Sequence, residues 1–223
     1  MEMKNEFEIC KHSEFCGGCV YQGVSYEEQL KMKAGEVRGL LEKKEIRCGE
    51  LLPIEPAPSQ FEYRNKMEYT FGDMEKGGEM TLGMHRKKRF MSIVTVDECQ
   101  LVHPDFNKVL RATLDFCREK GYSFYHKKSH KGMLRHLIVR RGVRTGELLI
   151  NLVTSTEPGF DDEAYVEMLR GLALEHKIVG VLRTFNDRLA DAVYCEKLSV
   201  LWGRDYYLEQ IMGLEFKVSA FSF

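Results

Sequence analysis

The chain has 223 residues, of which 43% are hydrophobic and 30% are charged. This composition excludes a disordered chain, a collagen-like repeat and a coiled coil, and it supplies enough apolar side chains for a buried core. Basic and acidic residues nearly cancel, with 33 Lys and Arg against 34 Asp and Glu, so nucleic-acid binding would need a local basic patch. No apolar run reaches the roughly 20 residues of a membrane span. The polar N-terminus is not a secretory signal, and we expect a cytoplasmic protein with no membrane partner.

The first part of the chain predicts a helix, a linker and a pair of strands. Ser25 and Glu28 form a capping box, and apolar residues recur at helical spacing through residues 25–45. Three prolines between positions 53 and 58 indicate an extended linker. Alternating aromatic and charged residues over 63–71 predict a strand, and the run 80–96 is expected to return as its hairpin partner.

The second part predicts two more helices and a second hairpin. Pro104 begins a helix that Gly121 ends, and a third helix is expected over 161–175. The remaining expected strands cover 134–140, 148–154, 178–185 and 193–202. The predicted fold class is therefore α+β, with antiparallel hairpins and flanking helices that follow a short cysteine-rich segment.

Three regions are expected along the chain. Residues 1–58 would hold the cysteine-rich segment and a linking helix, and 59–215 would form a central α+β domain. The last stretch, 216–223, is apolar and strand-like, whereas C-termini are usually polar and frayed. We expect it to begin a linker into a further domain.

The strongest chemical signal is a cluster of three cysteines. Cys10, Cys16 and Cys19 lie within ten residues, and a Gly-Gly pair separates the last two. Glycine permits the close wrapping that convergent thiolates require. Thiolates are soft ligands for Zn²⁺ or for iron–sulfur clusters, and either centre would most simply need a fourth ligand. The spacing does not decide between the two metals.

Cys99 is the favoured fourth ligand because it lies in a polar loop between a predicted strand and a predicted helix. Cys117 falls on the apolar stripe of that helix, where a cysteine usually behaves as a small buried hydrophobe. Cys195 lies in a strand-like run and Cys48 follows a helix end.

Four stretches of the sequence resemble one known family. The opening Cys10-x5-Cys16-Gly-Gly-Cys19, followed by Tyr21-Gln22, is similar to the cluster-binding start of the RNA uracil-C5 methyltransferases that carry a [4Fe–4S] centre. The stretch 63–71 resembles the first strand of that family's central domain, and Asp97-x-Cys99-x-Leu101 resembles the segment with its fourth cluster ligand. Residues 216–223 resemble the start of the motif that leads to its S-adenosylmethionine domain.

The resemblance implies a mechanism and its cofactors. In this family a cysteine thiolate attacks C6 of uracil, C5 takes a methyl group from S-adenosylmethionine, and a carboxylate then removes the C5 proton as the cysteine leaves C6. Both groups belong to a C-terminal Rossmann-like methyltransferase domain, which we expect to be absent from this chain. We therefore assign no catalytic or S-adenosylmethionine-binding residue here, and we expect the chain alone to be inactive. The implied metal site is a [4Fe–4S] cluster on Cys10, Cys16, Cys19 and Cys99.

The same resemblance implies an RNA substrate, most often 23S rRNA, while a tRNA uridine remains an alternative and DNA is not expected. Two acid-free stretches, 80–96 and 120–146, could supply the contacts, because cations pair with phosphates and neighbouring aromatic rings can stack on unpaired bases. A solvated hairpin face is the plainer interpretation of either stretch alone. The candidate RNA-binding residues are Arg64, Lys66, Arg86, Lys87, Lys88, Arg89, Lys127, Lys128, Lys131, Arg135 and His136.

Two other classes of protein compete with this interpretation. An iron–sulfur electron-transfer protein would carry its ligands in local Cys-x2-Cys repeats, whereas Cys99 is far from the first three cysteines. A zinc-ribbon RNA-binding module would carry two Cys-x2-Cys pairs, and only Cys16 and Cys19 have that spacing.

Overall fold

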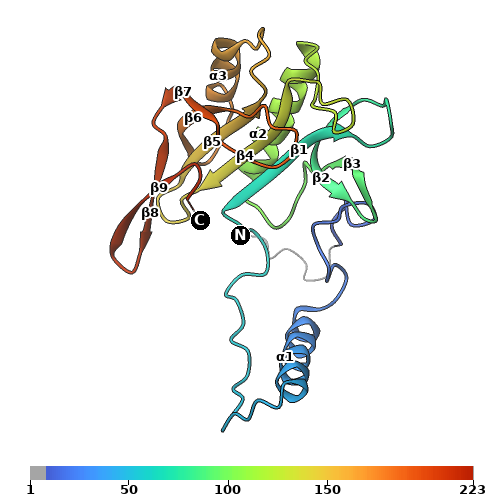
Figure 1. Ribbon diagram of the computed structural model, residues 1–223. Coiled ribbons are helices and arrows are strands. Elements are labelled where there is room, and N and C mark those ends of the chain that lie inside the picture. Colours follow the sequence, from blue (N-terminus) through green and yellow to red (C-terminus); the bar gives the residue numbers. More distant parts are fainter. Residues whose placement is uncertain (1–8, 223) are drawn as a thin grey trace.

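A seven-stranded mixed sheet forms the centre of the molecule, which is represented by a computed structural model describing residues 9–222 (Figure 1). The strand order is β3-β2-β1-β4-β5-β6-β7. All neighbours are antiparallel except β5 and β6. The strands are β1 (Lys66–Asp73), β2 (Met80–Arg86), β3 (Arg89–Thr95), β4 (Leu134–Arg141), β5 (Glu147–Thr154), β6 (Lys177–Phe185) and β7 (Lys197–Gly203).

The parallel pair corrects the predicted fold class. The sequence pattern predicted antiparallel hairpins with flanking helices, but β5 and β6 run in the same direction. Helix α3 (Asp162–Arg170) lies between β5 and β6 in the chain. It brings the chain back to the end of the sheet at which β5 begins, so that β6 can run parallel to β5. A parallel neighbour requires such a crossover, whereas a two-residue turn joins only antiparallel strands. The sheet is therefore mixed.

The run 80–96 also differs from its prediction, because it forms two strands rather than one. Lys88 adopts a φ of 60° in the tight turn between β2 and β3. Such backbone is usually given to Gly, Asn or Asp. The turn is built from Lys87 and Lys88, so the sequence carries no ordinary turn signal there.

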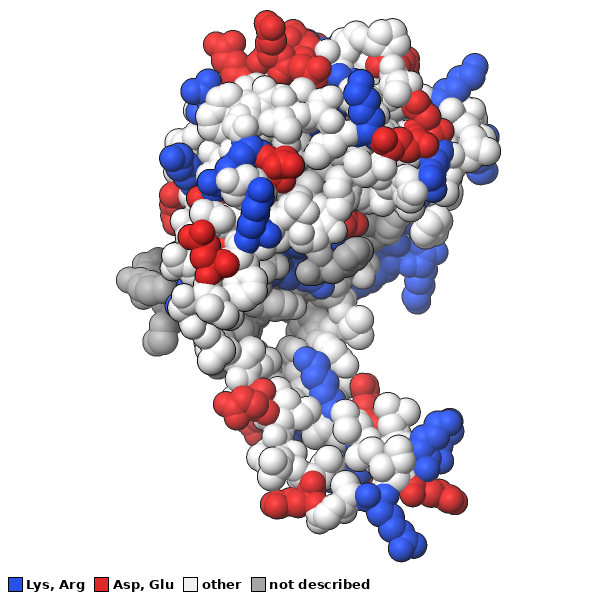
Figure 2. All heavy atoms as spheres, turned by 60° about the vertical axis from the view of Figure 1, so that its left-hand side comes forward, with Lys and Arg blue, Asp and Glu red and all other residues white. Residues whose placement is uncertain are grey.

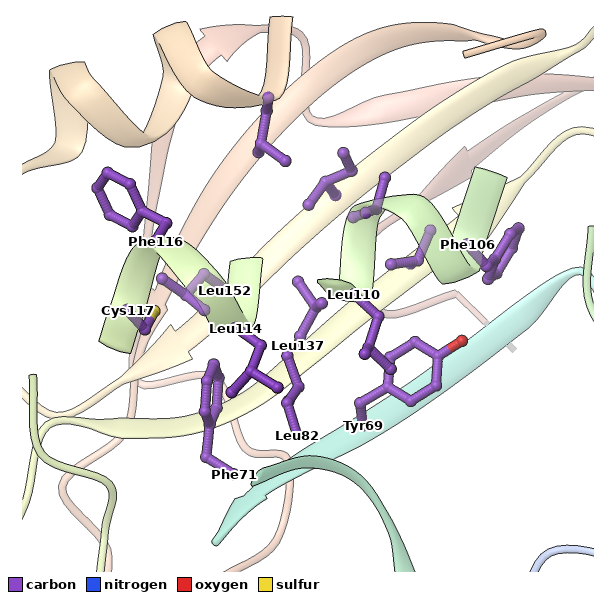
Figure 3. Close-up of a cluster of buried hydrophobic side chains, with 14 of the residues drawn as sticks. Tyr69, Phe71, Leu82, Phe106, Leu110, Leu114, Phe116, Cys117, Leu137 and Leu152 are labelled. Carbon is purple, nitrogen blue, oxygen red and sulfur yellow. The ribbon is translucent and has the colours of Figure 1, made fainter. Parts of the chain in front are cut away.

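Helix α2 (Pro104–Glu119) covers one face of the sheet and closes the main core (Figure 3). His103 caps its N-terminus by accepting a hydrogen bond from the amide of Asp105 at 3.2 Å. Phe106, Leu110 and Leu114 are fully buried against strands β1 and β4, as the helical spacing predicts. The position of this helix matters for the site, because the turn before it carries Cys99.

A second, smaller core lies on the other face of the sheet. The hairpin of β8 (Tyr206–Ile211) and β9 (Leu214–Ser219) packs there through Tyr207, against Leu149 and Leu182. Successive residues of a strand point to opposite faces, so Leu148 joins the main core while Leu149 joins the smaller one. Residues 216–219 of the stretch 216–223 are thus part of a hairpin on this sheet.

Helix α1 (Tyr26–Lys43) lies below the sheet, beside the extended linker that follows it (Figure 1). The Ser25 hydroxyl caps it as predicted, by accepting a hydrogen bond from the Glu28 amide. None of its residues is buried, although apolar residues recur along it at helical spacing. Among the described residues, no helix has the length and apolar character that a membrane crossing needs.

The core should be most sensitive at the centre of β4. Leu137 is fully buried, so Leu137→Ala should lower the free energy of unfolding by about 2–5 kcal/mol through lost burial and a residual cavity. Chemical denaturation measures this change. Leu189, which is 68% exposed, provides the control, since Leu189→Ala should change the free energy of unfolding by under about 0.5 kcal/mol. Equal effects of the two substitutions would contradict the assigned core.

Candidate functional site

The segment 10–19, here called the cysteine segment, is attached to the sheet by backbone hydrogen bonds. The amide of Gly17 donates to the carbonyl of His85 at 2.9 Å, and the amide of Lys87 donates to the carbonyl of Phe15 at 2.8 Å. The Lys87 ammonium adds a bond to the carbonyl of Ser13 at 2.5 Å. A Cβ at Gly17 would lie 2.9 Å from the His85 oxygen. The first glycine of the Gly-Gly pair is therefore required by close backbone approach.

This attachment places the three N-terminal cysteines around one cavity together with Cys99. Cys10, Cys16, Cys19 and Cys99 all line it, and its remaining walls include apolar side chains such as Met67, Met84 and Val96. Cys99 is held in the turn before α2 by Asn107, whose side-chain amide donates to the Cys99 carbonyl and accepts from its amide, both at 3.2 Å. Cys48, Cys117 and Cys195 do not line this cavity.

The thiols in the cavity favour their protonated form. Burial raises the pKa of Cys16, Cys19 and Cys99, and repulsion between the neighbouring cysteines raises it further. The Lys87 ammonium and the Arg64 guanidinium oppose this by lowering the pKa of Cys19. Thiolates without a bound cation would thus be unfavourable in this cavity, because burial and mutual repulsion disfavour their charge. A cationic centre would offset this free-energy cost.

The four sulfur atoms surround the cavity without converging on one point. A zinc ion with sulfur ligands at about 2.3 Å would need sulfurs within roughly 4 Å of one another. Within residues 9–222, the group whose ligand atoms all lie within 4.8 Å of one another is instead His103, Asp105 and His176. The cysteines are therefore more widely spaced than a single ion requires.

The group around Asp105 is explained by hydrogen bonding. The fully buried Asp105 carboxylate accepts from the Glu175 amide at 3.2 Å, from the His176 amide at 2.8 Å and from His176 Nδ1 at 2.8 Å. These bonds connect the start of α2 to the segment that precedes β6. The carboxylate oxygens are already satisfied, as a structural role requires.

The two basic stretches of the sequence meet at one edge of the sheet. We call Arg86–Arg89 the basic turn and residues 126–131 the basic loop. The Lys127 ammonium lies 4.3 Å from the centre of the Phe90 ring, and that ring stacks on His85. These contacts join the basic loop to the strands that carry the basic turn, which are distant in sequence.

The candidate RNA-binding residues then divide by exposure. Lys88, Lys128 and Lys131 are exposed on the basic turn and the basic loop. Arg86 and Arg89 are held by Glu75, at 2.8 and 3.3 Å, and Lys66 pairs with Glu68 at 2.6 Å. Arg64 is exposed near Cys19. Figure 2 shows another face, where charges of both signs are interspersed and acidic side chains gather at the top of the view.

Two of the candidate residues are buried, His136 at 5% exposure and Arg135 at 1%. Its guanidinium donates to the carbonyls of Asn186, Arg188 and Ala190 at 2.5, 2.7 and 3.3 Å, and it lies 3.8 Å from the Tyr125 ring centre. These contacts hold the irregular segment between β6 and β7. The geometry gives Arg135 a structural role in this segment.

Asp191 completes this arrangement and was missed by the sequence analysis. It lies 3.1 Å from both Lys127 Nζ and His136 Nε2, while Thr70 Oγ1 lies 3.3 Å from the other ring nitrogen of His136. Burial raises the pKa of Asp191, but its pairing with His136 and Lys127 lowers it more, to about 2. No sequence signal marked this residue, because a single Asp in an irregular segment is ordinary.

The Asp191 carboxylate should make stability depend on acid pH. Its pKa of about 2 lies below the usual 3.8, so its contribution is fully present above pH 3.8 and is lost as the pH falls toward 2. The shift corresponds to about 2 kcal/mol. Asp191→Asn should lower the free energy of unfolding at neutral pH and flatten its decline in that acid range, as measured by denaturation at several pH values. The exposed Asp205 provides the control through Asp205→Asn, and identical pH profiles for the two variants would contradict the pairing.

Comparison with known proteins finds relatives that match nearly the whole chain. No family model matches the chain. The chain is 49% identical over 223 residues to an uncharacterised RNA methyltransferase of Caldanaerobacter subterraneus, covering 99% of this chain and 49% of the relative. It is 45% identical over 208 residues to a second one, from Clostridium tetani, covering 93% of this chain and 46% of the relative. The chain is therefore related, over nearly its whole length, to proteins named as RNA methyltransferases. It spans about half the length of these relatives.

A solved structure shares the fold of this chain. The Pyrococcus abyssi tRNA (uracil-54, C5)-methyltransferase, solved with S-adenosyl-L-homocysteine, matches with a TM-score of 0.72 at 22% identity. The match covers 93% of this chain and 46% of that enzyme. It overturns the expectation that methyltransferase structure is absent from this chain. The mixed sheet of this chain matches part of the fold of that enzyme. The predicted antiparallel hairpins had instead suggested a domain separate from the methyltransferase fold.

Proposed function

We propose that this chain is the RNA-binding and cluster-binding part of an S-adenosylmethionine-dependent enzyme that methylates C5 of a uridine. The observation that carries the proposal is the joint presence of RNA methyltransferase relatives and of one cavity shared by Cys10, Cys16, Cys19 and Cys99. The solved neighbour acts on uracil C5 of tRNA and was solved with the demethylated cofactor product. No residue of this chain is assigned to the methyl transfer itself.

The donor set fits a [4Fe–4S] cluster better than a single zinc ion. Four cysteines are the usual ligands of such a cluster, and all four line one cavity with apolar walls. Within residues 9–222 these cysteines do not form a group as close as a single ion requires, which favours a larger centre. When bound, the group would supply a cationic centre that stabilises the thiolates and links the cysteine segment to the turn before α2. Lys87 and Arg64 would lie beside it and lower the cost of its thiolate charges.

Removal of Cys99 should abolish the proposed centre. Protein prepared without oxygen should be brown and contain about four irons and four sulfides per chain. Cys99→Ala should lose most of this iron and make residues 9–24 more sensitive to protease, because the link to the sheet is broken. Metal analysis, the visible absorption spectrum and limited proteolysis measure these effects.

Two other cysteines provide matched controls for this experiment. Cys117 is buried in the main core, where desolvation raises its pKa to about 12, and Cys195 is exposed. Cys117→Ala and Cys195→Ala should keep the full iron content. A colourless wild type with one bound zinc would reject the cluster but keep the ligand set. A full iron content in Cys99→Ala would reject Cys99 as an essential ligand and make Cys48 the next candidate for the fourth ligand.

The exposed lysines of the basic turn and the basic loop should bind RNA phosphates. The triple substitution Lys88→Ala, Lys128→Ala and Lys131→Ala should weaken RNA binding and flatten its salt dependence. Each lost phosphate contact should reduce the slope of log affinity against log salt by about 0.7–0.9. Filter binding at several salt concentrations measures both quantities.

An equal change of charge at the far end of α1 provides the control. Lys43, Lys44 and Arg47 are exposed there, and their joint replacement by Ala should leave the slope nearly unchanged. Equal losses in both triple variants would show a diffuse charge effect rather than a site. Unchanged binding in the first variant would return its lysines to a solvated hairpin surface.

The resemblance favours 23S rRNA as the substrate, while the solved neighbour is a tRNA enzyme. Binding of the chain to transcripts of 23S rRNA and of tRNA compares the two classes directly. Tighter binding to 23S rRNA is expected under the proposal. Tighter binding to tRNA would leave the proposed reaction unchanged but would assign tRNA as the substrate.

A further inference from the structure

A second cavity, of about 590 Å³, opens on the other side of Cys19. Its walls come from the end of the cysteine segment, the start of α1 and the residues that precede β1. Its volume lies within the roughly 300–1,000 Å³ of small-molecule sites. Cys19 and Arg64 line both this cavity and the cysteine cavity, so the two share one wall.

The walls combine aromatic rings with positive charge. Tyr21, Tyr26 and Tyr63 line the cavity together with Lys33 and Arg64. Tyr63 is 55% exposed, although a large aromatic ring is costly to leave in water without a partner. The Lys33 ammonium lies 5.2 Å from the centre of the Tyr21 ring, and Arg64 forms no ion pair with a described residue. No acidic residue is among the described residues that line the cavity.

Polar amides complete the set of donors and acceptors. Gln22, Gln29 and Gln60 line the same cavity. The side-chain nitrogen of Gln29 donates to the carbonyl of Val24 at 2.9 Å, which fixes this amide and leaves its oxygen as an acceptor. Amide groups form hydrogen bonds with the edges of unpaired bases. Aromatic, cationic and amide side chains therefore line the same cavity.

We propose that this cavity binds one unpaired nucleotide of the RNA, and this proposal rests on the proposed function. The base would stack on Tyr63, and its phosphate would pair with Arg64 and Lys33. Ring faces accept any base, while the cations provide the phosphate contact. The absence of carboxylates from the described part of the wall favours an anionic ligand. A nucleotide bound here lies against Cys19 and covers that side of the cysteine cavity.

The test compares two exposed tyrosines. Tyr63→Ala should weaken binding of a short single-stranded RNA by roughly 5- to 150-fold, the range for loss of one stacked base. The salt slope should stay unchanged, because stacking involves no phosphate. Arg64→Gln should instead lower that slope by about 0.7. Tyr194, which is 45% exposed and lies outside this cavity, provides the matched control through Tyr194→Ala.

A fluorescent base reports the stacking directly. RNA that contains 2-aminopurine should lose fluorescence on binding to the wild type and to Tyr194→Ala, and should keep it on binding to Tyr63→Ala. Equal affinity and equal quenching in the two tyrosine variants would overturn the nucleotide site. This outcome would leave the proposed function intact if the triple lysine variant still lost binding.

The remaining outcomes separate other ligands from RNA. Failure of the wild type to bind any RNA would overturn this proposal and the proposed RNA-binding function together. Uridine monophosphate that bound as tightly as the oligonucleotide, with the same dependence on Tyr63, would identify a free-nucleotide site and overturn the RNA assignment. Protection of bound iron from a chelator by RNA in the wild type, with its loss in Tyr63→Ala, would support contact beside Cys19.

Discussion

The backbone attachment of the cysteine segment to the turn between β2 and β3 is the constraint on which the candidate site depends. Without the bonds from Gly17 and Lys87, the three N-terminal cysteines would have no fixed position relative to Cys99. A free loop that contains several thiols can bind metal, but it pays the full entropy of ordering when it does so. Here the sheet already supplies most of that order. The same bonds explain why a glycine stands beside Cys16, where backbone meets backbone.

Positive charge serves two purposes in this protein, and burial distinguishes them. Arg135, Arg140 and Arg141 are at most 6% exposed, and each donates to a backbone carbonyl of a distant segment. A buried guanidinium with several donors can satisfy carbonyls that have no strand partner. On the basic turn and the basic loop, Lys88, Lys128 and Lys131 are instead exposed to solvent. The acid-free stretch 120–146 therefore contains both buried arginines that hold other segments and exposed lysines.

This division explains how far the sequence could predict the structure. The capping signals at Ser25 and Pro104 placed two helices within a residue or two of their observed starts. Cysteine spacing and loop context selected the four cysteines that line one cavity. The direction of β6 was missed, because a strand pattern carries no information about parallel pairing. Arg135 and Asp191 could not be placed, since their partners lie on segments that are distant in sequence. The stripe on α1 indicated a helix but could not show whether any surface covered it.

The lack of buried residues in α1 has a consequence for how the molecule unfolds locally. A helix of 18 residues that buries none of them is supported mainly by its own hydrogen bonds and its Ser25 cap, and such helices are marginal in water. Its amide hydrogens should exchange with solvent through local fraying, while those of β4 should exchange only when the whole sheet unfolds. The protein therefore contains two units of very different cooperativity. The hydrogen bond from the Ala57 amide to the Tyr26 hydroxyl, at 2.7 Å, joins α1 to its own linker and not to the sheet.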